Sequence, residues 1–343
     1  MKTIQSVTLS CLTSAALAAM AVACSRQSSE GQSPSPDPTA KASKESGRFT
    51  LGPSQKHPGE QDGSAGVALD EKHFLAATDE NNILRLYSTD TEAPGTKLID
   101  LNESLGFPPK TNGEFRECDI EAAARFDATT IFWIGSHGLN SGGDLRENRR
   151  VLFATSVVSD KTPPQVSLKG SPCKSLMEAF EKTDFLKQAA KKKPEEEGGF
   201  NIEGLCAYRG QLMIGFRNPI PDAKAVVIPL ENPAGVIAGE PPKLGAPIRL
   251  NLGGLGIRDM ASWHNEILIL AGDYKDRSAG AKSQELYRWS GDPKDSPVHI
   301  PGNFGDLNPE AVLVYGEKGS ERVQVLSDDG GDAFRSAFLE IQP

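Results

Sequence analysis

Basic residues are in the minority in this chain of 343 residues, in which 37 Lys and Arg stand against 46 Asp and Glu. The formal net charge of -9 gives a surface that repels polyanions and therefore argues against a nucleic-acid partner. Beyond the N-terminal region, no apolar run approaches the roughly 18 residues that a membrane-spanning helix needs. The mature protein is therefore not expected to span a bilayer.

Cysteine is also scarce, and the five present show no CxxC or Cys/His spacing of the kind that holds zinc. Cys118 and Cys206 lie beside two copies of a repeated motif, so both a disulfide between them and two buried thiols fit the sequence. The G-x-S-x-G elbow, the P-loop and the dinucleotide fingerprint are missing too. The glycine-rich stretch 253–256 does not lie between a strand and a helix.

Glycine and proline are plentiful instead, with 34 and 24 residues. They predict many tight turns rather than long helices, so a helical bundle is not expected. The first 23 residues are expected to be an export signal, with Lys2 followed by a mainly apolar stretch. Residues 25–47 are rich in Ser, Pro, Gln, Glu and Lys and predict a disordered tether.

The residues Ala21-Val22-Ala23-Cys24 resemble the end of a bacterial lipoprotein signal, in which the cysteine is lipidated and becomes the new N-terminus. A plain secretory signal cleaved after Ala23 is the alternative. We therefore expect a domain at 48–343 that is held to membrane lipid through Cys24. The location expected is the bacterial cell envelope, and Ser25 resembles a signal for the outer membrane, facing either the periplasm or the cell surface.

A weak repeat runs through the body of the chain and carries most of the information. Each unit has a carboxylate, a short apolar strand, a polar turn and a second apolar strand. Four clear copies begin at 119–123, 201–205, 257–261 and 308–312, and a fifth at 64–68 lacks the carboxylate. The repeated carboxylates are Glu121, Glu203, Asp259 and Glu310.

The spacing of these carboxylates predicts an all-β propeller. They are 82, 56 and 51 residues apart, which suits one four-stranded blade per unit. A helical insertion at 171–193 accounts for the longest interval. The last unit is one strand short, and Arg48 to Leu51 is a spare strand able to complete it and close a five-bladed ring. A six-bladed ring with a degenerate blade near 160–200 and a two-sheet sandwich are the alternatives.

The motifs Asp-Ile-Glu-Ala at 119–122 and Asn-Ile-Glu-Gly-Leu at 201–205 are followed by Gly-Ser-His-Gly and Phe-Arg-Asn-Pro at strand ends. Together they resemble a bacterial propeller-like family called domain of unknown function 3616, over roughly residues 60–335. More distantly, the strand starts are similar to those of esterase-like phytase and lactonase propellers. The resemblance implies a fold and a bacterial location but no activity.

In a propeller the innermost strands start around one mouth of the central axis, so the four repeated carboxylates should meet there. We expect Arg217, Asn218, Arg258, Asp273 and Asp328 to join them as ligand-binding residues. Like charges so close need compensation. Either a cation such as calcium is bound by Glu121, Glu203, Asp259 and Glu310, or arginines and backbone N–H groups neutralise them and staple the blades together.

His137 is a candidate general base at this mouth, with Ser136 beside it, although a polar loop residue is the plainer interpretation. The loop 141–150 carries three arginines that suit either an anionic substrate or solvent. Three function classes follow. A binding module for a small-molecule or protein partner ranks first, a divalent-metal-dependent hydrolase of phosphoesterase or lactonase type second, and a structural lipoprotein with stapling carboxylates third.

Overall fold

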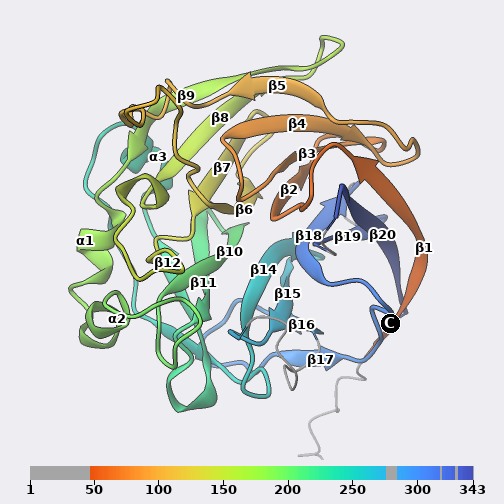
Figure 1. The fold of residues 1–343 in the computed structure, drawn as a ribbon. Helices are drawn as coiled ribbons and strands as arrows, with labels where there is room; N and C mark the ends of the chain where they lie inside the picture. Colours follow the sequence, from red (N-terminus) through yellow and green to blue (C-terminus); the bar gives the residue numbers. More distant parts are fainter. Residues whose placement is uncertain (1–46, 276–283, 317–318, 329–330, 343) are drawn as a thin grey trace, which may run out of the picture. The chain divides into compact units, whose positions relative to one another are not determined.

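Five four-stranded antiparallel sheets surround one axis in the computed structural model, which describes residues 47–275, 284–316, 319–328 and 331–342 (Figure 1). Each sheet is one blade of a propeller, and the first strand of its repeat unit lies nearest the axis. The five-bladed prediction is confirmed, and the six-bladed ring and the two-sheet sandwich are wrong.

The blades follow the order of the chain, and in the first four the strands run in chain order from the axis outward. The first blade comprises β2 (Ala65–Ala68), β3 (His73–Ala77), β4 (Ile83–Ser88) and β5 (Thr96–Asp100). The second comprises β6 (Ile120–Arg125), β7 (Thr130–Gly135), β8 (Leu152–Val158) and β9 (Gln165–Cys173). The third comprises β10 (Asn201–Tyr208), β11 (Gln211–Asn218), β12 (Ala225–Leu230) and β13 (Ile248–Leu250). The fourth comprises β14 (Gly256–Trp263), β15 (Glu266–Gly272), β16 (Glu285–Trp289) and β17 (Val298–Ile300).

The fifth blade closes the ring with strands from both ends of the domain. Its strands are β18 (Pro309–Tyr315), β19 (Arg322–Ser327), β20 (Ala333–Gln342) and, outermost, β1 (Arg48–Pro58). β1 pairs antiparallel with β20, from Arg48 opposite Gln342 to Pro58 opposite Ala333. The predicted closing strand is therefore present and longer than expected, and it covers an edge that would otherwise be exposed.

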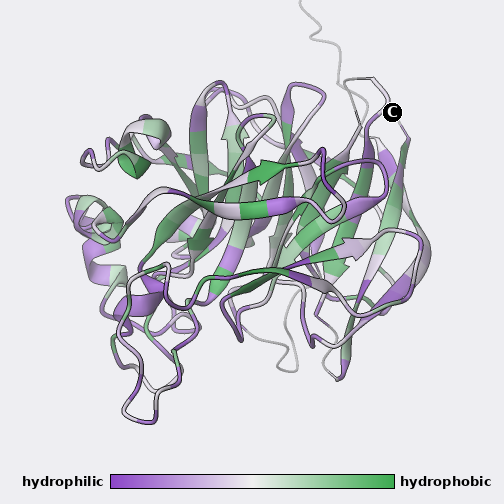
Figure 2. Ribbon diagram, turned by 90° about the horizontal axis from the view of Figure 1, so that it is seen from above, coloured by the Kyte–Doolittle hydropathy of each residue, from purple (hydrophilic) through white to green (hydrophobic). Residues whose placement is uncertain are grey.

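Apolar side chains fill the spaces between neighbouring blades. Phe132 of β7, for example, belongs to the same buried cluster as Leu205 of β10 and Ile214 of β11. The alternation of hydrophobic and polar segments along the strands is visible in Figure 2. This packing follows from the apolar strands of each repeat, because a blade can bury its two faces only against its neighbours.

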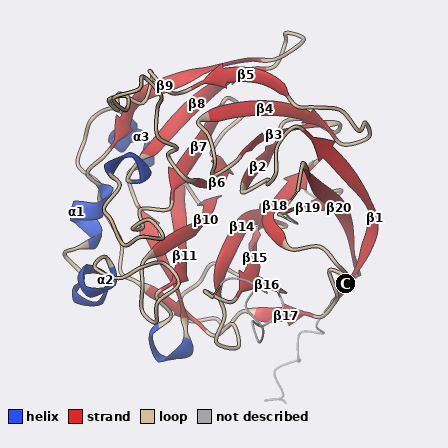
Figure 3. Cartoon of the chain, in the orientation of Figure 1, coloured by secondary structure: helices blue, strands red, loops and turns tan. Residues whose placement is uncertain are grey.

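The helices are short and lie outside the sheets (Figure 3). Within 171–193 the chain forms α1 (Leu176–Phe180) and α2 (Asp184–Ala189), and α3 (Pro233–Ile237) follows β12. Two single 3₁₀ turns lie at Glu147–Arg149 and Pro221–Ala223. In the described part of the chain, no helix is long and apolar enough to cross a membrane.

The three cysteines of the domain, Cys118, Cys173 and Cys206, are free and buried. Of the two alternatives for Cys118 and Cys206, the structure shows the buried thiols. Cys24, the export signal and nearly all of the tether lie outside the described residues.

Candidate functional site

A β-bulge near the start of four innermost strands turns one side chain in each blade toward the axis. The strand pairing skips Glu121 in β6, Glu203 in β10, Arg258 in β14 and Glu310 in β18. The first blade has no such bulge between β2 and β3. Because a bulge leaves its extra residue outside the ladder and re-aims the side chain, it places these four residues at one mouth.

The register corrects one member of the predicted carboxylate ring. In the fourth blade the position that matches Glu121, Glu203 and Glu310 is held by Arg258, and Asp259 comes one residue later. Successive residues of a strand point to opposite sides, so Asp259 does not line the mouth. The ring therefore has three carboxylates and one arginine.

Asp259 instead joins three blades. Its Oδ2 accepts a hydrogen bond of 2.8 Å from the backbone N–H of Val312 in β18, and the backbone N–H of Leu205 in β10 also donates to the carboxylate. The residue is 1% exposed, and burial raises the pKa of its carboxyl well above the usual range. This is the stapling arrangement that the sequence left open, realised at one position.

The mouth is a polar cavity of about 830 Å³, called the cup below. Among the described residues that line it, ten are acidic and four are basic, and Leu139 and Pro194 are its apolar members. The acidic residues are Asp62, Asp79, Glu80, Asp119, Glu121, Glu195, Glu203, Asp273, Glu310 and Asp328, and the basic ones are Arg149, Arg217, Arg258 and Lys275. Such a lining suits a charged or hydroxylated molecule rather than an apolar one.

Another, much smaller space is lined mainly by apolar residues of the five innermost strands. They line a space of only about 100 Å³, and Ala124, Leu205, Met260 and Leu313 are among them.

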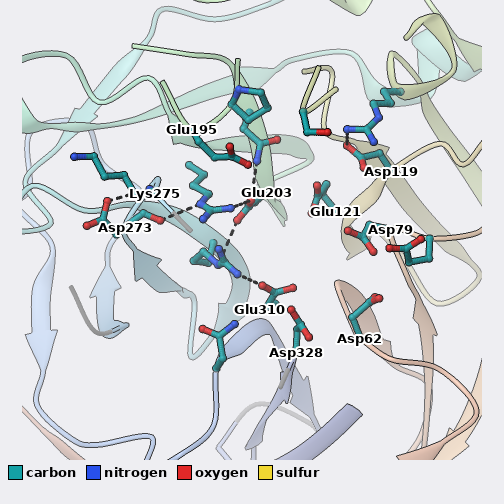
Figure 4. A pocket seen from close by; sticks show the side chains of 18 of the residues that line it. Asp62, Asp79, Asp119, Glu121, Glu195, Glu203, Asp273, Lys275, Glu310 and Asp328 are labelled. Atoms are coloured by element: carbon teal, nitrogen blue, oxygen red, sulfur yellow. Dashed lines mark hydrogen bonds and ion pairs between the residues drawn. The ribbon is translucent and has the colours of Figure 1, made fainter. Parts of the chain in front are cut away.

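One side of the cup is neutralised by two arginines. Arg258 Nε lies 3.3 Å from Glu203 Oε2, and the Arg258 guanidinium also pairs with Glu310. Arg217 Nη1 donates to Glu203 Oε1 at 2.8 Å, while its Nε donates to the carbonyl oxygen of Asp273 at 2.9 Å. Figure 4 shows these contacts as dashed lines around Glu203 and Glu310. Glu203 is 5% exposed, so a buried carboxylate is paired with two buried cations.

Glu121 lies on the other side and receives no such partner. In the described part of the chain it makes neither a hydrogen bond nor an ion pair. Burial raises the pKa of its carboxyl well above the usual range, and the charges of Asp119, Glu203 and Asp79 raise it further, against a smaller opposing effect of Arg258. Glu121 therefore tends to hold a proton unless a cation comes close.

Asp62 and Asp79 stand beside Glu121 in Figure 4 and form a hydrogen-bonded carboxyl pair. Ser64 supports the pair: its hydroxyl donates to Asp62 Oδ1 at 2.8 Å and accepts from the backbone N–H of Asp79 at 3.3 Å. Burial and the adjacent Asp62 raise the pKa of Asp79 to about 8. The two carboxyl groups thus share a proton near neutral pH.

Asp119 combines features of both sides of the cup, because its carboxyl has an arginine partner and also a raised pKa. Burial raises the pKa of its carboxyl to about 7, although Arg149 Nη1 lies 2.9 Å from its Oδ2 and works in the opposite direction. Arg149 comes from the arginine-rich loop 141–150, and of the three arginines there it is the one that lines the cup. Arg146 pairs with Asp144 at 3.2 Å.

Asn201, at the start of β10, adds an unused hydrogen-bond acceptor to the wall. Its Nδ2 donates to Glu203 Oε1 at 2.7 Å, but its Oδ1 has no partner among the described residues. The residue is 5% exposed and lines the cup. An unpaired buried acceptor carries a free-energy cost.

Two predicted site residues lie elsewhere. His137 is fully buried, donates from Nδ1 to the carbonyl oxygen of Gly135 at 2.8 Å, and packs near Phe180 of α1. Burial lowers the pKa of its imidazole to about 4, and the residue lies under the helical insertion and not at the mouth. Asn218 is buried too, and its amide donates to the carbonyl oxygens of Pro194 and Glu196, which fixes a loop at the rim.

The predicted calcium ligands do not fit one shared ion. Glu203 and Glu310 direct their oxygens to arginines, and Asp259 faces backbone N–H groups away from the cup. Among the residues that the structure describes, no three His, Cys, Asp or Glu side chains are arranged to hold a metal ion. The other residues predicted to bind a ligand do line the cup, namely Arg217, Arg258, Asp273 and Asp328.

Because several carboxyl groups of the cup hold protons in the folded protein, stability is expected to fall as the pH rises. Asp79 and Asp119 have folded-state pKa values of about 8 and about 7, above their values in an unfolded chain. Their contribution is therefore complete below the unfolded pKa of 3.8, and it is lost progressively as the pH rises from there through 7 to 8.

We expect the free energy of unfolding to drop on the order of 2 kcal/mol between pH 6 and pH 9, allowing for solvent screening, and Asp79→Asn to flatten this slope. Urea denaturation at several pH values measures it. A free energy that rises over this range, or the same slope in Asp79→Asn, would contradict the assignment.

The fold and this cup define a five-bladed β-propeller with an acidic pocket at one end of its axis. The model of the family described as protein of unknown function (DUF3616) matches residues 148–328, and the chain belongs to that family. A comparison with curated protein sequences finds no significant match.

Among solved structures, the major allergen Mala s 1 of Malassezia sympodialis is similar at 10% identity and a TM-score of 0.50, over 84% of this chain and 96% of that one. The glutaminyl cyclase of Myxococcus xanthus shares 15% identity at a TM-score of 0.47, over 87% of this chain and 100% of that one. An arabinanase of Bacillus subtilis shares 8% identity at a TM-score of 0.43, over 85% of this chain and 96% of that one. Identities this low concern the fold alone.

Proposed function

We propose that this protein is an envelope-anchored binding module whose acidic cup takes a small organic cation rich in hydrogen-bond donors, such as a polyamine or an amino sugar. The observation that carries the proposal is the uneven neutralisation of the cup. Two arginines serve Glu203 and Glu310, whereas Glu121 and the pair Asp62 and Asp79 have no basic side chain within ion-pair distance in the described part of the chain.

A ligand cation supplies the positive charge that is lacking on the side of the cup formed by Glu121, Asp62 and Asp79. Its N–H groups can donate to the unpaired carboxyl oxygens, and such charge-assisted hydrogen bonds are among the strong ones. The ligand class therefore combines positive charge with several donors.

The two other function classes receive less support. A metal-dependent hydrolase needs carboxylate oxygens that the arginines and backbone already occupy at Glu203, Glu310 and Asp259. A purely structural role explains Asp259 and the arginine pairs, but it gives no reason for Glu121, whose burial beside other acids costs stability without a contact in return.

Calorimetric titration at low ionic strength tests the binding site. We expect spermidine and glucosamine to bind, and glucose, which lacks the charge, to bind far more weakly. Glu121→Gln should weaken spermidine binding about fivefold, since one charged contact at a partly open site is lost. Glu178→Gln, which removes an exposed acid on α1, is the matched control and should bind as the wild type does. Equal binding of glucose and glucosamine, or an unchanged affinity in Glu121→Gln, would refute the proposed ligand class.

The anchor is proposed from the sequence around Cys24, where lipid attachment would hold the propeller at the outer membrane of the envelope. Cys24→Ala should leave the protein unprocessed or release it from the membrane fraction. Fractionation and mass spectrometry of the N-terminal peptide measure this. If the wild-type peptide carries no acyl group and the variant still sediments with membranes, the lipoprotein assignment is wrong.

A further inference from the structure

A second cavity, chemically unlike the cup, lies between the second and third blades. It has a volume of about 370 Å³ and is lined mainly by apolar groups. Its walls come from the β6–β7 turn, β7, β9 and α3, and Figure 1 shows α3 beside β8 and β9. The lining residues are Phe126, Asp127, Thr130, Phe132, Lys169, Gly170, Ala234, Ile237 and Ala238.

The walls of this cavity are held firmly in place. Phe126 and Phe132 meet edge to face with ring centroids 5.5 Å apart, and Phe132 is almost fully buried. Gly170 has φ +69°, and a Cβ there would overlap the carbonyl oxygen of Ile237, so β9 and α3 are in close backbone contact. The α3 side of the cavity is lined by small alanine side chains. A mainly apolar cavity of this size with few polar groups is typical of small-molecule sites.

Lys169 supplies the one basic group among the described residues of the lining. Its Nζ donates to Thr130 Oγ1 at 2.5 Å, and no carboxylate pairs with it in the described part of the chain. Asp127, the acid nearby, is occupied by the backbone N–H groups of Thr129 and Thr130 and by both hydroxyls. An ammonium has three N–H donors, so Lys169 retains two of them for an anionic partner.

We infer that this cavity binds an amphipathic monocarboxylate, with the apolar body against Phe126, Phe132 and Ile237 and the carboxylate on Lys169. The charge of the lysine argues for an anion, and the apolar walls exclude a small inorganic one because it would lose its hydration without compensation. This site is independent of the acidic cup and of the ligand proposed there.

The test is calorimetric titration of the full protein with octanoate, 1-octanol and octylamine. We expect octanoate to bind about tenfold more tightly than 1-octanol, because the charged head adds hydrogen bonds to Lys169, and octylamine to bind most weakly. Lys169→Met keeps the apolar stem and should reduce octanoate to the affinity of 1-octanol. Lys161→Met, an exposed lysine of the same blade that donates to Gln165, is the matched control and should change nothing.

Ala238→Phe fills the cavity from an exposed position at the end of α3 and should abolish binding of both octanoate and 1-octanol. A melting curve and the circular dichroism spectrum check that each variant is folded. Absence of octanoate binding, equal affinity for octanoate and 1-octanol, or undiminished binding in Ala238→Phe would overturn the proposal.

Discussion

Glu203→Gln is expected to lower the free energy of unfolding by about 3 kcal/mol, whereas Glu121→Gln should leave it unchanged or raise it. The two residues hold the same bulge position in adjacent blades, so the comparison mainly tests their surroundings. Removing the charge of Glu203 takes away the buried carboxylate that Arg217 and Arg258 share, and Arg258 keeps its pairing with Glu310. Removing the carboxyl of Glu121 relieves a group that burial and neighbouring acids already hold in the protonated form.

Urea denaturation of the two variants at pH 7 measures this difference. Glu178→Gln on the surface of α1 is the control, with an expected change within about 0.5 kcal/mol. An equal loss of unfolding free energy in Glu203→Gln and Glu121→Gln would contradict the difference between them, in which Glu203 is paired with arginines and Glu121 is not.

Deletion of residues 48–58 should abolish cooperative folding, since it removes the whole of β1. This strand pairs with β20 over most of its length, and it buries Phe49 and His57. Phe49 packs against Phe304 with ring centroids 4.7 Å apart. The deletion exposes the edge of β20 and opens the ring, and its cost approaches the whole stability of a domain, about 5–15 kcal/mol.

Phe49→Ala tests the same contact if the deletion variant cannot be purified. We expect it to cost about 3 kcal/mol, as for other buried phenylalanines, while Thr50→Ala on the exposed side of β1 costs less than about 0.5 kcal/mol. A deletion variant that melts at the wild-type temperature would contradict the closure of the ring by β1.

The fold can be predicted from the sequence because each blade repeats one pattern. Every unit carries two apolar strands after a polar start, and the spacing of the units matches one four-stranded sheet. The spare strand at Arg48 to Leu51 then has one place to pair, because a propeller leaves no open edge. These features depend on local pattern and chain length, which a sequence shows directly.

The site is harder to predict, because its residues are chosen by strand register. Aligning the repeats on their carboxylates selects Asp259, but aligning them on the apolar residue before the bulge, Ile120, Ile202 and Ile257, selects Arg258. A bulge shifts the side chain without leaving a mark in composition. This one-residue difference decides whether the ring consists of four acids, or of three acids and an arginine that pairs with two of them.

Other parts of the site depend on segments outside the repeated strands. Asp62 lies before β2 in the blade whose repeat lacks the carboxylate, and its position three residues ahead of Ala65 is the signal that could have identified it. Asn201 precedes Glu203 by two residues, and that spacing on one strand puts both side chains on the same wall. The placement of His137 at the mouth is wrong because α1 packs over it, and nothing in the sequence near the histidine shows that a later insertion covers it.

In the proposed function, Glu121, Asp62 and Asp79 hold protons that a cationic ligand displaces. Calorimetric titration of spermidine at pH 7, in phosphate and in Tris, tests it most directly, because the two buffers take up protons with different heats. We expect a net release of protons on binding by the wild type and a smaller release by Glu121→Gln. Binding with the same heat in both buffers, or no binding of spermidine, would contradict it.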